Sequence, residues 1–130
     1  MLCRMTVAIR HVTIDCADPY ELAGFWQEVT GWPRADDDFP GDPEASLVAP
    51  DEATGLWFQQ VPEPKTVKNR VHLDIASREH GRDEEVQRLL GLGARFVADH
   101  RNADGTGFVV LADPVGNEFC VVRSAAERES

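Results

Sequence analysis

The chain has 130 residues, 42% of them hydrophobic, which is enough to bury the core of one globular domain. Its 23 acidic residues outnumber the 13 lysines and arginines, and a net charge of −10 argues against nucleic acid or an anionic membrane as a partner. No apolar run approaches the ~20 residues that span a bilayer, and the start of the chain lacks the apolar core of a signal peptide, so we expect a cytoplasmic protein. The three cysteines are widely spaced, which argues against a disulfide framework or a zinc knuckle.

The first half of the chain predicts a strand, a helix and three further strands. Alternating apolar residues mark a strand over residues 6–15. Asp18 is placed to cap a helix that begins at Pro19, and an apolar stripe at helical spacing continues to Gly31, a typical helix end. Short strands are expected at residues 32–34, 45–49 and 55–61.

The second half repeats this order after a polar connector at residues 62–69. A strand is expected over residues 70–76, followed by a helix that starts near residues 77–83 and ends at Gly93. Three further strands are expected at residues 94–98, 107–112 and 118–123. The polar tail, residues 124–130, is expected to fray.

The two halves are related by a constant offset of 61 residues. His11 and His72 open strands of similar composition, and Phe58-Gln59 and Phe119-Cys120 show the same offset at the far end of each half. A duplication of this kind predicts two similar modules that face one another, because neither buries its apolar side alone. We therefore expect the functional site between the modules, with the two histidines close together.

Strand periodicity divides the polar and apolar residues of the expected site. Residues two apart on a strand share a face, so His11, Thr13 and Asp15 lie on one face of the first strand. His72 and Asp74 lie on the corresponding face in the second half, and the apolar residues between them face the helices. Burying such polar groups without partners costs about 1–3 kcal/mol each, so this asymmetry indicates a site.

The order of these elements, together with four short motifs, resembles the glyoxalase, bleomycin-resistance and extradiol-dioxygenase (vicinal oxygen chelate) superfamily, especially its small glyoxalase-like domain branch. The motifs are Asp18-Pro19, Gly31-Trp32, His72-Leu73-Asp74 and Asp113-Pro114-x-Gly116-Asn117. The resemblance covers roughly residues 6–123.

The resemblance implies an α+β fold of two tandem βαβββ modules. Their eight strands would form an open cup with the helices on the outside. Residues 1–130 would then be a single domain, with module one at about 6–61, the connector at 62–69, module two at about 70–123 and the tail at 124–130. It also implies a small-molecule ligand and a homodimer.

Members of the superfamily hold a divalent metal with residues from the first and last strand of each module. These positions fall on His11, Gln59, His72 and Cys120, and Cys120 stands where a glutamate is usual. A thiolate there is a soft ligand that favours zinc, whereas a buried neutral thiol binds metals poorly. The resemblance therefore implies one divalent ion, Zn, Mn, Fe or Ni, and the missing glutamate leaves a metal-free protein as the alternative.

Two functions follow from this reading. The first is a metal-assisted lyase, isomerase or dioxygenase that acts on a small oxygenated molecule. In it His72 and Asp74 would be catalytic, by ligand orientation or proton transfer, and Trp57, Asp15 and Thr13 would contact the substrate.

The second function is metal-free sequestration of an aromatic or drug-like molecule, as the resemblance to bleomycin-binding members allows. Each candidate residue also has a purely structural interpretation. The histidines would be hydrogen-bonded remnants of an ancestral site, Asp74 would bond backbone across the sheet, Cys120 would fill space in the core, and Trp57 would pack on the sheet. Bound metal in the purified protein would favour the enzyme.

Overall fold

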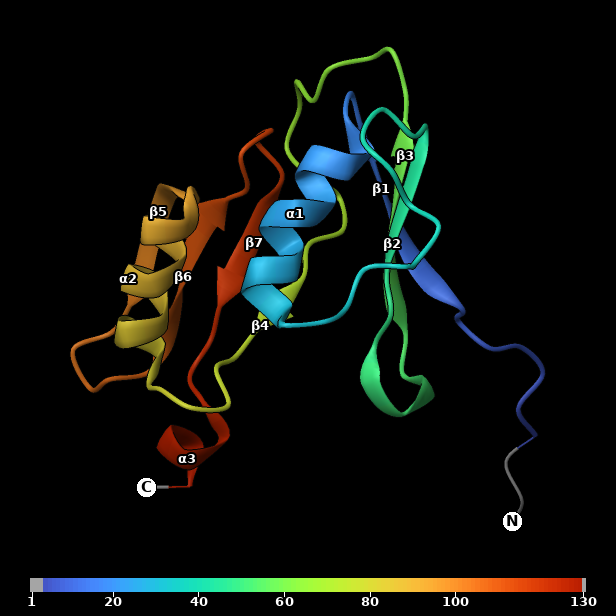
Figure 1. Ribbon diagram of the computed structural model, residues 1–130. Coiled ribbons are helices and arrows are strands. Elements are labelled where there is room, and N and C mark those ends of the chain that lie inside the picture. Colours follow the sequence, from blue (N-terminus) through green and yellow to red (C-terminus); the bar gives the residue numbers. More distant parts are fainter. Residues whose placement is uncertain (1–3, 130) are drawn as a thin grey trace. The chain divides into compact units, whose positions relative to one another are not determined.

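The computed structural model describes residues 4–129 and divides into two compact units, Met1–Pro64 and Lys65–Ser130 (Figure 1). The boundary between the units falls inside the connector expected at residues 62–69. Within residues 4–129, none of the helices has the length and apolar character needed to cross a lipid bilayer.

The first unit contains a three-stranded sheet in the order β1, β3, β2, with a helix against one face. Strand β3 is parallel to β1 and antiparallel to β2. The elements are β1 (His11–Cys16), α1 (Pro19–Thr30), β2 (Glu44–Leu47), the short 3-10 helix η1 (Pro50–Glu52) and β3 (Gly55–Gln60). The core between helix and sheet includes Leu22, Trp26, Leu47, Leu56 and Phe58, each at most 5% exposed.

Helix α1 confirms the prediction made from its end signals. The Asp18 side chain accepts a hydrogen bond from the backbone N–H of Glu21 at 3.3 Å, and Pro19 occupies the first turn. Gly31 adopts a left-handed conformation with φ of 75° and donates its N–H to the carbonyl of Gln27. These local signals are enough to set both ends of the helix.

The second unit contains a four-stranded sheet in the order β4, β7, β6, β5. Strands β4 and β7 are parallel, and the other neighbours are antiparallel. The elements are β4 (Asp74–Ile75), α2 (Arg82–Leu92), β5 (Arg95–Arg101), β6 (Gly107–Ala112), β7 (Glu118–Val121) and α3 (Ala125–Arg128). The strand, helix, three-strand order expected for this half is therefore present.

Three predicted strands differ most from what the described residues form. Residues 32–34 form only a single bridge, Arg34 to Leu47, because Pro33 has no N–H for a ladder and the Arg34 guanidinium instead lies 3.8 Å from the centre of the Tyr20 ring. The first strand begins at His11 rather than residue 6, and β4 spans two residues rather than 70–76. The α+β class is confirmed, but residues 4–129 contain seven strands, and the eight-stranded cup is not confirmed.

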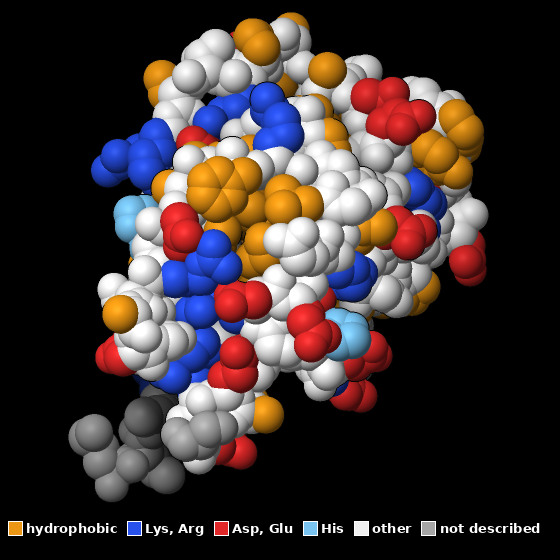
Figure 2. Space-filling model, turned by 90° about the vertical axis from the view of Figure 1, so that its left-hand side faces the viewer, with side chains coloured by type: hydrophobic (Ala, Val, Ile, Leu, Met, Phe, Trp, Pro, Cys, Tyr) orange, Lys and Arg blue, Asp and Glu red, His pale blue; other side chains and the backbone are white. Residues whose placement is uncertain are grey.

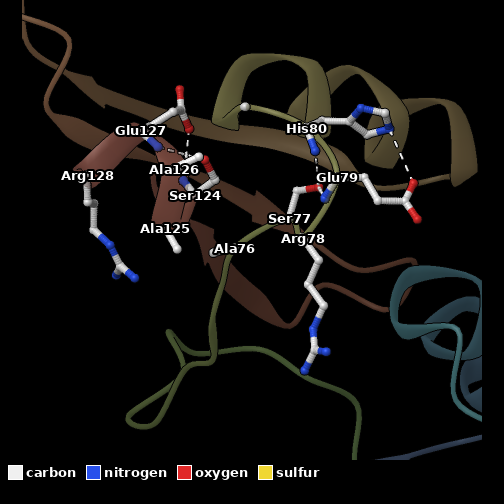
Figure 3. Close-up of a pocket in the computed structure, with 11 residues that line it drawn as sticks. Ala76, Ser77, Arg78, Glu79, His80, Ser124, Ala125, Ala126, Glu127 and Arg128 are labelled. Carbon is white, nitrogen blue, oxygen red and sulfur yellow. Dashed lines mark hydrogen bonds and ion pairs between the residues drawn. The ribbon is translucent and has the colours of Figure 1, made fainter. Parts of the chain in front are cut away.

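The prediction of a frayed tail is wrong, because residues 125–128 form α3 (Figure 3). The Ser124 hydroxyl accepts from the N–H of Glu127, and the Glu127 carboxylate accepts from the N–H of Ser124 in return, which is a capping box. The same carboxylate accepts from the N–H of Arg82 at 2.7 Å and so caps α2 as well. Helix α3 and the segment 76–81 line a pocket at this end of the unit.

Buried Arg82 ties the start of α2 to the turn between β5 and β6. Its side chain is 6% exposed, and Nη1 donates to the carbonyl oxygens of Gly105, Thr106 and Gly107 at 3.0–3.2 Å. This guanidinium therefore satisfies three backbone acceptors that lie far from α2 in the sequence.

Replacing Arg82 by methionine is expected to lower the free energy of unfolding by about 2–4 kcal/mol, because the three carbonyls lose a charged donor. Urea denaturation would measure the change. Arg78→Met is the matched control, since Arg78 is exposed and is expected to change stability by less than about 0.5 kcal/mol. Equal stabilities of the two variants would show that the buried guanidinium has no stabilising role.

Apolar side chains are exposed on the second unit. Phe96, Val97 and Phe108 are 37–54% exposed, and Val115 is 41% exposed. Figure 2 shows one face of the molecule, on which hydrophobic side chains gather among interspersed acidic and basic groups. Such surface is typical of an interface with another chain, and the homodimer remains a prediction.

Candidate functional site

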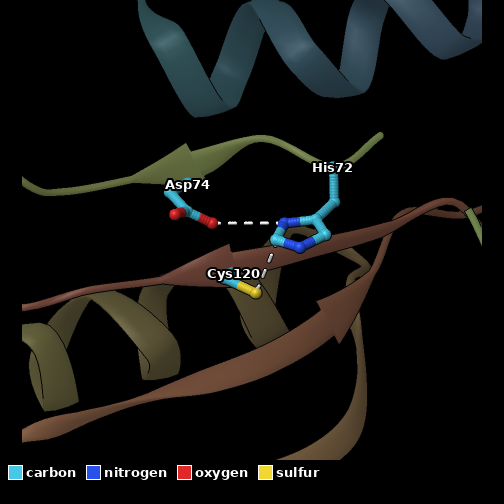
Figure 4. Close-up of side chains that lie close together, drawn as sticks. All are labelled: His72, Asp74 and Cys120. Carbon is cyan, nitrogen blue, oxygen red and sulfur yellow. Dashed lines mark hydrogen bonds and ion pairs between the residues drawn. The ribbon is translucent and has the colours of Figure 1, made fainter. Parts of the chain in front are cut away.

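Three side chains of the second unit with metal-ligand chemistry lie around one point (Figure 4). His72 precedes β4, Asp74 begins β4, and Cys120 lies opposite Asp74 on β7. Nδ1 of His72 is 3.2 Å from Oδ1 of Asp74 and 3.7 Å from Sγ of Cys120. One ligand atom from each residue lies within 4.8 Å of the other two.

The pairing of β4 with β7 produces this arrangement. The N–H of Cys120 donates to the carbonyl of Leu73, and the N–H of Val122 donates to that of Ile75, both at 2.9 Å. Alternation along β7 then directs Phe119 to the apolar core while Cys120 takes the opposite face with Asp74. The sequence predicted a shared face for His72 and Asp74 and named Cys120 with His72 as expected metal ligands, and the structure brings all three together.

A buried aspartate sets the turn from which β7 begins. Asp113 is 0% exposed, and its Oδ1 accepts from the N–H groups of Val115 at 3.1 Å and Asn117 at 2.9 Å. Its Oδ2 accepts from the Asn117 side-chain amide at 2.9 Å, and Gly116 has a φ of 98°. The Asp113-Pro114-x-Gly116-Asn117 motif therefore places Cys120 indirectly, by fixing the start of its strand.

The thiol of Cys120 is held in its neutral form. Burial raises the pKa of Cys120 above its ordinary value, and the neighbouring Asp74 carboxylate raises it further, while the positive charge of Lys68 opposes both. A thiol with a raised pKa is a weak nucleophile at neutral pH.

The geometry differs from a cysteine–histidine–aspartate triad. In a triad the nucleophile and the carboxylate engage opposite nitrogens of the imidazole. Here Cys120 and Asp74 both approach Nδ1 of His72. Three ligand atoms that converge on one point are better arranged to bind a cation than to pass a proton from one residue to the next.

The site residues expected in the first unit share the sheet face opposite α1. The register pairs Thr13 with Trp57 and Asp15 with Gln59 on neighbouring strands. The imidazole of His11 stacks on the Trp57 indole with ring centres 4.3 Å apart and an interplanar angle of 12°. Trp57 is 38% exposed. The structure thus brings His11 to Trp57, and the expectation that His11 and Gln59 share an ion with His72 and Cys120 remains a prediction.

The sequence reasoning missed a polar cluster next to the three donors. Glu118 accepts from the Lys65 ammonium at 3.0 Å and from the N–H of Asn69 at 3.2 Å, and its own N–H donates to the Asn69 side chain at 3.2 Å. These partners are about fifty residues apart in the chain, so no local pattern signals the contact.

The fold is that of the vicinal oxygen chelate superfamily. The chain belongs to the glyoxalase-like domain family, whose model matches residues 11–122. A comparison with curated proteins finds no match.

Several solved structures share the fold. A glyoxalase/bleomycin resistance protein/dioxygenase family enzyme from Burkholderia phytofirmans has a TM-score of 0.67 and 19% identity, over 88% of this chain and 97% of its own. A fosfomycin resistance protein, FosX from Listeria monocytogenes, complexed with Mn(II) and 1S,2S-dihydroxypropylphosphonic acid, has a TM-score of 0.71 and 15% identity, over 95% of each chain. A lactoylglutathione lyase from Agrobacterium tumefaciens has a TM-score of 0.62 and 17% identity, over 95% of this chain and 97% of its own. At these identities the similarity establishes the fold alone.

Proposed function

We propose that this protein is a metal-assisted enzyme of the lyase, isomerase or oxygenase kind that acts on a small oxygenated molecule. The observation that carries the proposal is the convergence of His72, Asp74 and Cys120 on one point. The Mn(II) in the FosX structure supports it, since that protein holds a divalent ion on a similar fold.

The donor set fits a divalent cation. Imidazole nitrogen, carboxylate oxygen and thiolate sulfur are all ligands of zinc, and three protein ligands leave a coordination position for substrate. The side chains of His72 and Asp74 are 41% and 59% exposed, so a ligand has access to the site from solvent. Of the metals expected from the resemblance, this set favours zinc.

The protein side of the chemistry consists of orientation and proton transfer. A divalent ion held by these residues would supply Lewis acidity toward an oxygen of the substrate. In the metal-free protein Asp74 orients the imidazole through its 3.2 Å contact with Nδ1. With an ion bound, the carboxylate oxygen that does not ligate would be placed to accept a proton from a substrate. Cys120 contributes a ligand only after its thiol has lost a proton.

A cobalt(II) titration of chelator-treated protein tests the metal site. Coordination by Cys120 is expected to produce a thiolate-to-cobalt charge-transfer band at a stoichiometry of one, and Cys120→Ser is expected to remove it. Cys16→Ser is the matched control, because Cys16 is buried in the first unit, and it is expected to keep the band. Absence of the band in the wild type would rule out a cysteine-containing metal site.

Sequestration of a planar ligand is the second candidate function. The observation that supports it is the stacking of His11 on the 38% exposed Trp57, an arrangement that a flat aromatic ligand would extend. A protein that stays metal-free and binds planar aromatic molecules, with binding lost in Trp57→Ala, would support this candidate over the enzyme.

Metal affinity is expected to rise with pH. Because the pKa of Cys120 is raised, the metal must displace a proton at neutral pH, and each pH unit should increase the association constant by up to about tenfold from this group. Calorimetric titrations of the chelator-treated protein with zinc, at several values between about pH 7 and 8, measure this dependence. Cys120→Ser should flatten it, and an unchanged slope would show that the thiol is not a ligand.

A further inference from the structure

Strand β4 is too short to hold His72 in place by itself. It spans two residues, and its ladder to β7 rests on the hydrogen bonds that Leu73 and Ile75 accept from β7. His72 lies just before the strand with its side chain 41% exposed, so packing by itself restrains the imidazole only in part. Cys120, in contrast, lies on β7 between two neighbouring strands and is 5% exposed.

A second attachment joins the segment before His72 to the start of β7. Glu118 binds Asn69 reciprocally, as acceptor through its carboxylate and as donor through its backbone N–H, and also pairs with Lys65. The Glu118 and Lys65 side chains are only 16% and 21% exposed, so the contact is better shielded from water than an ordinary surface ion pair. Asn69 precedes His72 by three residues, and Glu118 precedes Cys120 by two.

Glu118 is not a substitute for the glutamate ligand that the superfamily resemblance leads one to expect. Alternation along β7 places it on the same face as Cys120, but both of its oxygens are already engaged by Lys65 and Asn69. The Glu118 carboxylate therefore binds Lys65 and Asn69 and is not available as a metal ligand.

We propose that Glu118 is a positioning residue, which holds residues 65–69 against β7 and thereby keeps the imidazole of His72 within ligating distance of Asp74 and Cys120. The effect on metal affinity rests on the proposed function, but the attachment of residues 65–69 to Glu118 is a property of the metal-free protein. Partners that orient metal ligands typically contribute 10–100-fold to affinity.

The test compares Glu118→Ala with Glu127→Ala. Glu127 is a matched control because it is also a carboxylate of the second unit that accepts two backbone N–H groups, those of Arg82 and Ser124. In Glu118→Ala the cobalt dissociation constant is expected to rise by about 10–100-fold. In Glu127→Ala it should stay at the wild-type value even though the protein loses stability. Glu118→Gln, which keeps an acceptor for Asn69, should restore most of the affinity.

Amide hydrogen exchange on the metal-free protein provides an independent readout. Glu118→Ala should speed exchange at the N–H groups of Cys120 and Val122, which bind the β4 carbonyls, by at least about tenfold, and Glu127→Ala should not. The inference is overturned if Glu118→Ala changes neither cobalt affinity nor this exchange, or if both variants change them equally. If the wild type lacks the thiolate band, the proposed function fails by itself, and exchange alone decides whether Glu118 restrains β4.

Discussion

His72→Ala is expected to weaken zinc or cobalt binding by more than about 100-fold, since substitutions of mere ligand partners already cost 10–100-fold. The variant removes the nitrogen that lies nearest both other donors, 3.2 Å from Asp74 and 3.7 Å from Cys120. Stability should change little, because the imidazole is 41% exposed. Competition with a chromogenic chelator measures the affinity.

Two further histidine variants make this experiment specific. His80→Ala is the control. His80 lies in the same unit but pairs with Glu84 and Glu79, away from the proposed metal site. The metal affinity of this variant should equal that of the wild type. His11→Ala tests the ligand expected from the duplicated sequence. A loss in His11→Ala comparable to that in His72→Ala would make His11 a ligand of the same ion. Wild-type affinity in His72→Ala would refute the metal site proposed for the second unit.

Local signals in the sequence were sufficient where structure depends on neighbouring residues. The ends of α1 follow from Asp18, Pro19 and Gly31, all within one or two residues of the helix. Strand β6 matches its predicted range, residues 107–112, because turn-forming residues bound it on both sides. Local signals wrongly predicted a strand at residues 32–34. Pro33 interrupts the pairing there, and the Arg34 guanidinium donates to the carbonyl of Tyr20.

The candidate site could be predicted only in part, for the same reason. Strand alternation correctly grouped His72 with Asp74, and the 61-residue offset identified Cys120 as the position to examine. The role of Asp74 as a third donor depends on the register between β4 and β7, which the sequence does not specify. Glu118 pairs with Lys65, which lies 53 positions away in the chain, and a polar contact over that separation produces no periodic pattern in the sequence.

Asp113→Ala is expected to lower the free energy of unfolding by about 3–5 kcal/mol, a large share of the 5–15 kcal/mol typical of a domain. The substitution removes the buried carboxylate that accepts from Val115 and from both nitrogens of Asn117, and leaves those donors without their acceptor in the turn. Because β7 begins directly after this turn, the variant should also lose cobalt affinity. Urea denaturation, followed by circular dichroism, measures the stability change.

Asp104→Ala separates the effect of burial from that of turn geometry. Asp104 also accepts from a backbone N–H and a side chain, those of Thr106, in the turn between β5 and β6, but it is exposed to solvent. Water replaces the lost acceptor there, so we expect a change of at most about 1 kcal/mol. Asp113→Asn should lie between the two, because an amide keeps one acceptor but presents a donor to the Asn117 amide. If Asp113→Ala were no more destabilising than Asp104→Ala, the motif would not owe its role to a buried carboxylate, and the placement of Cys120 would need another cause.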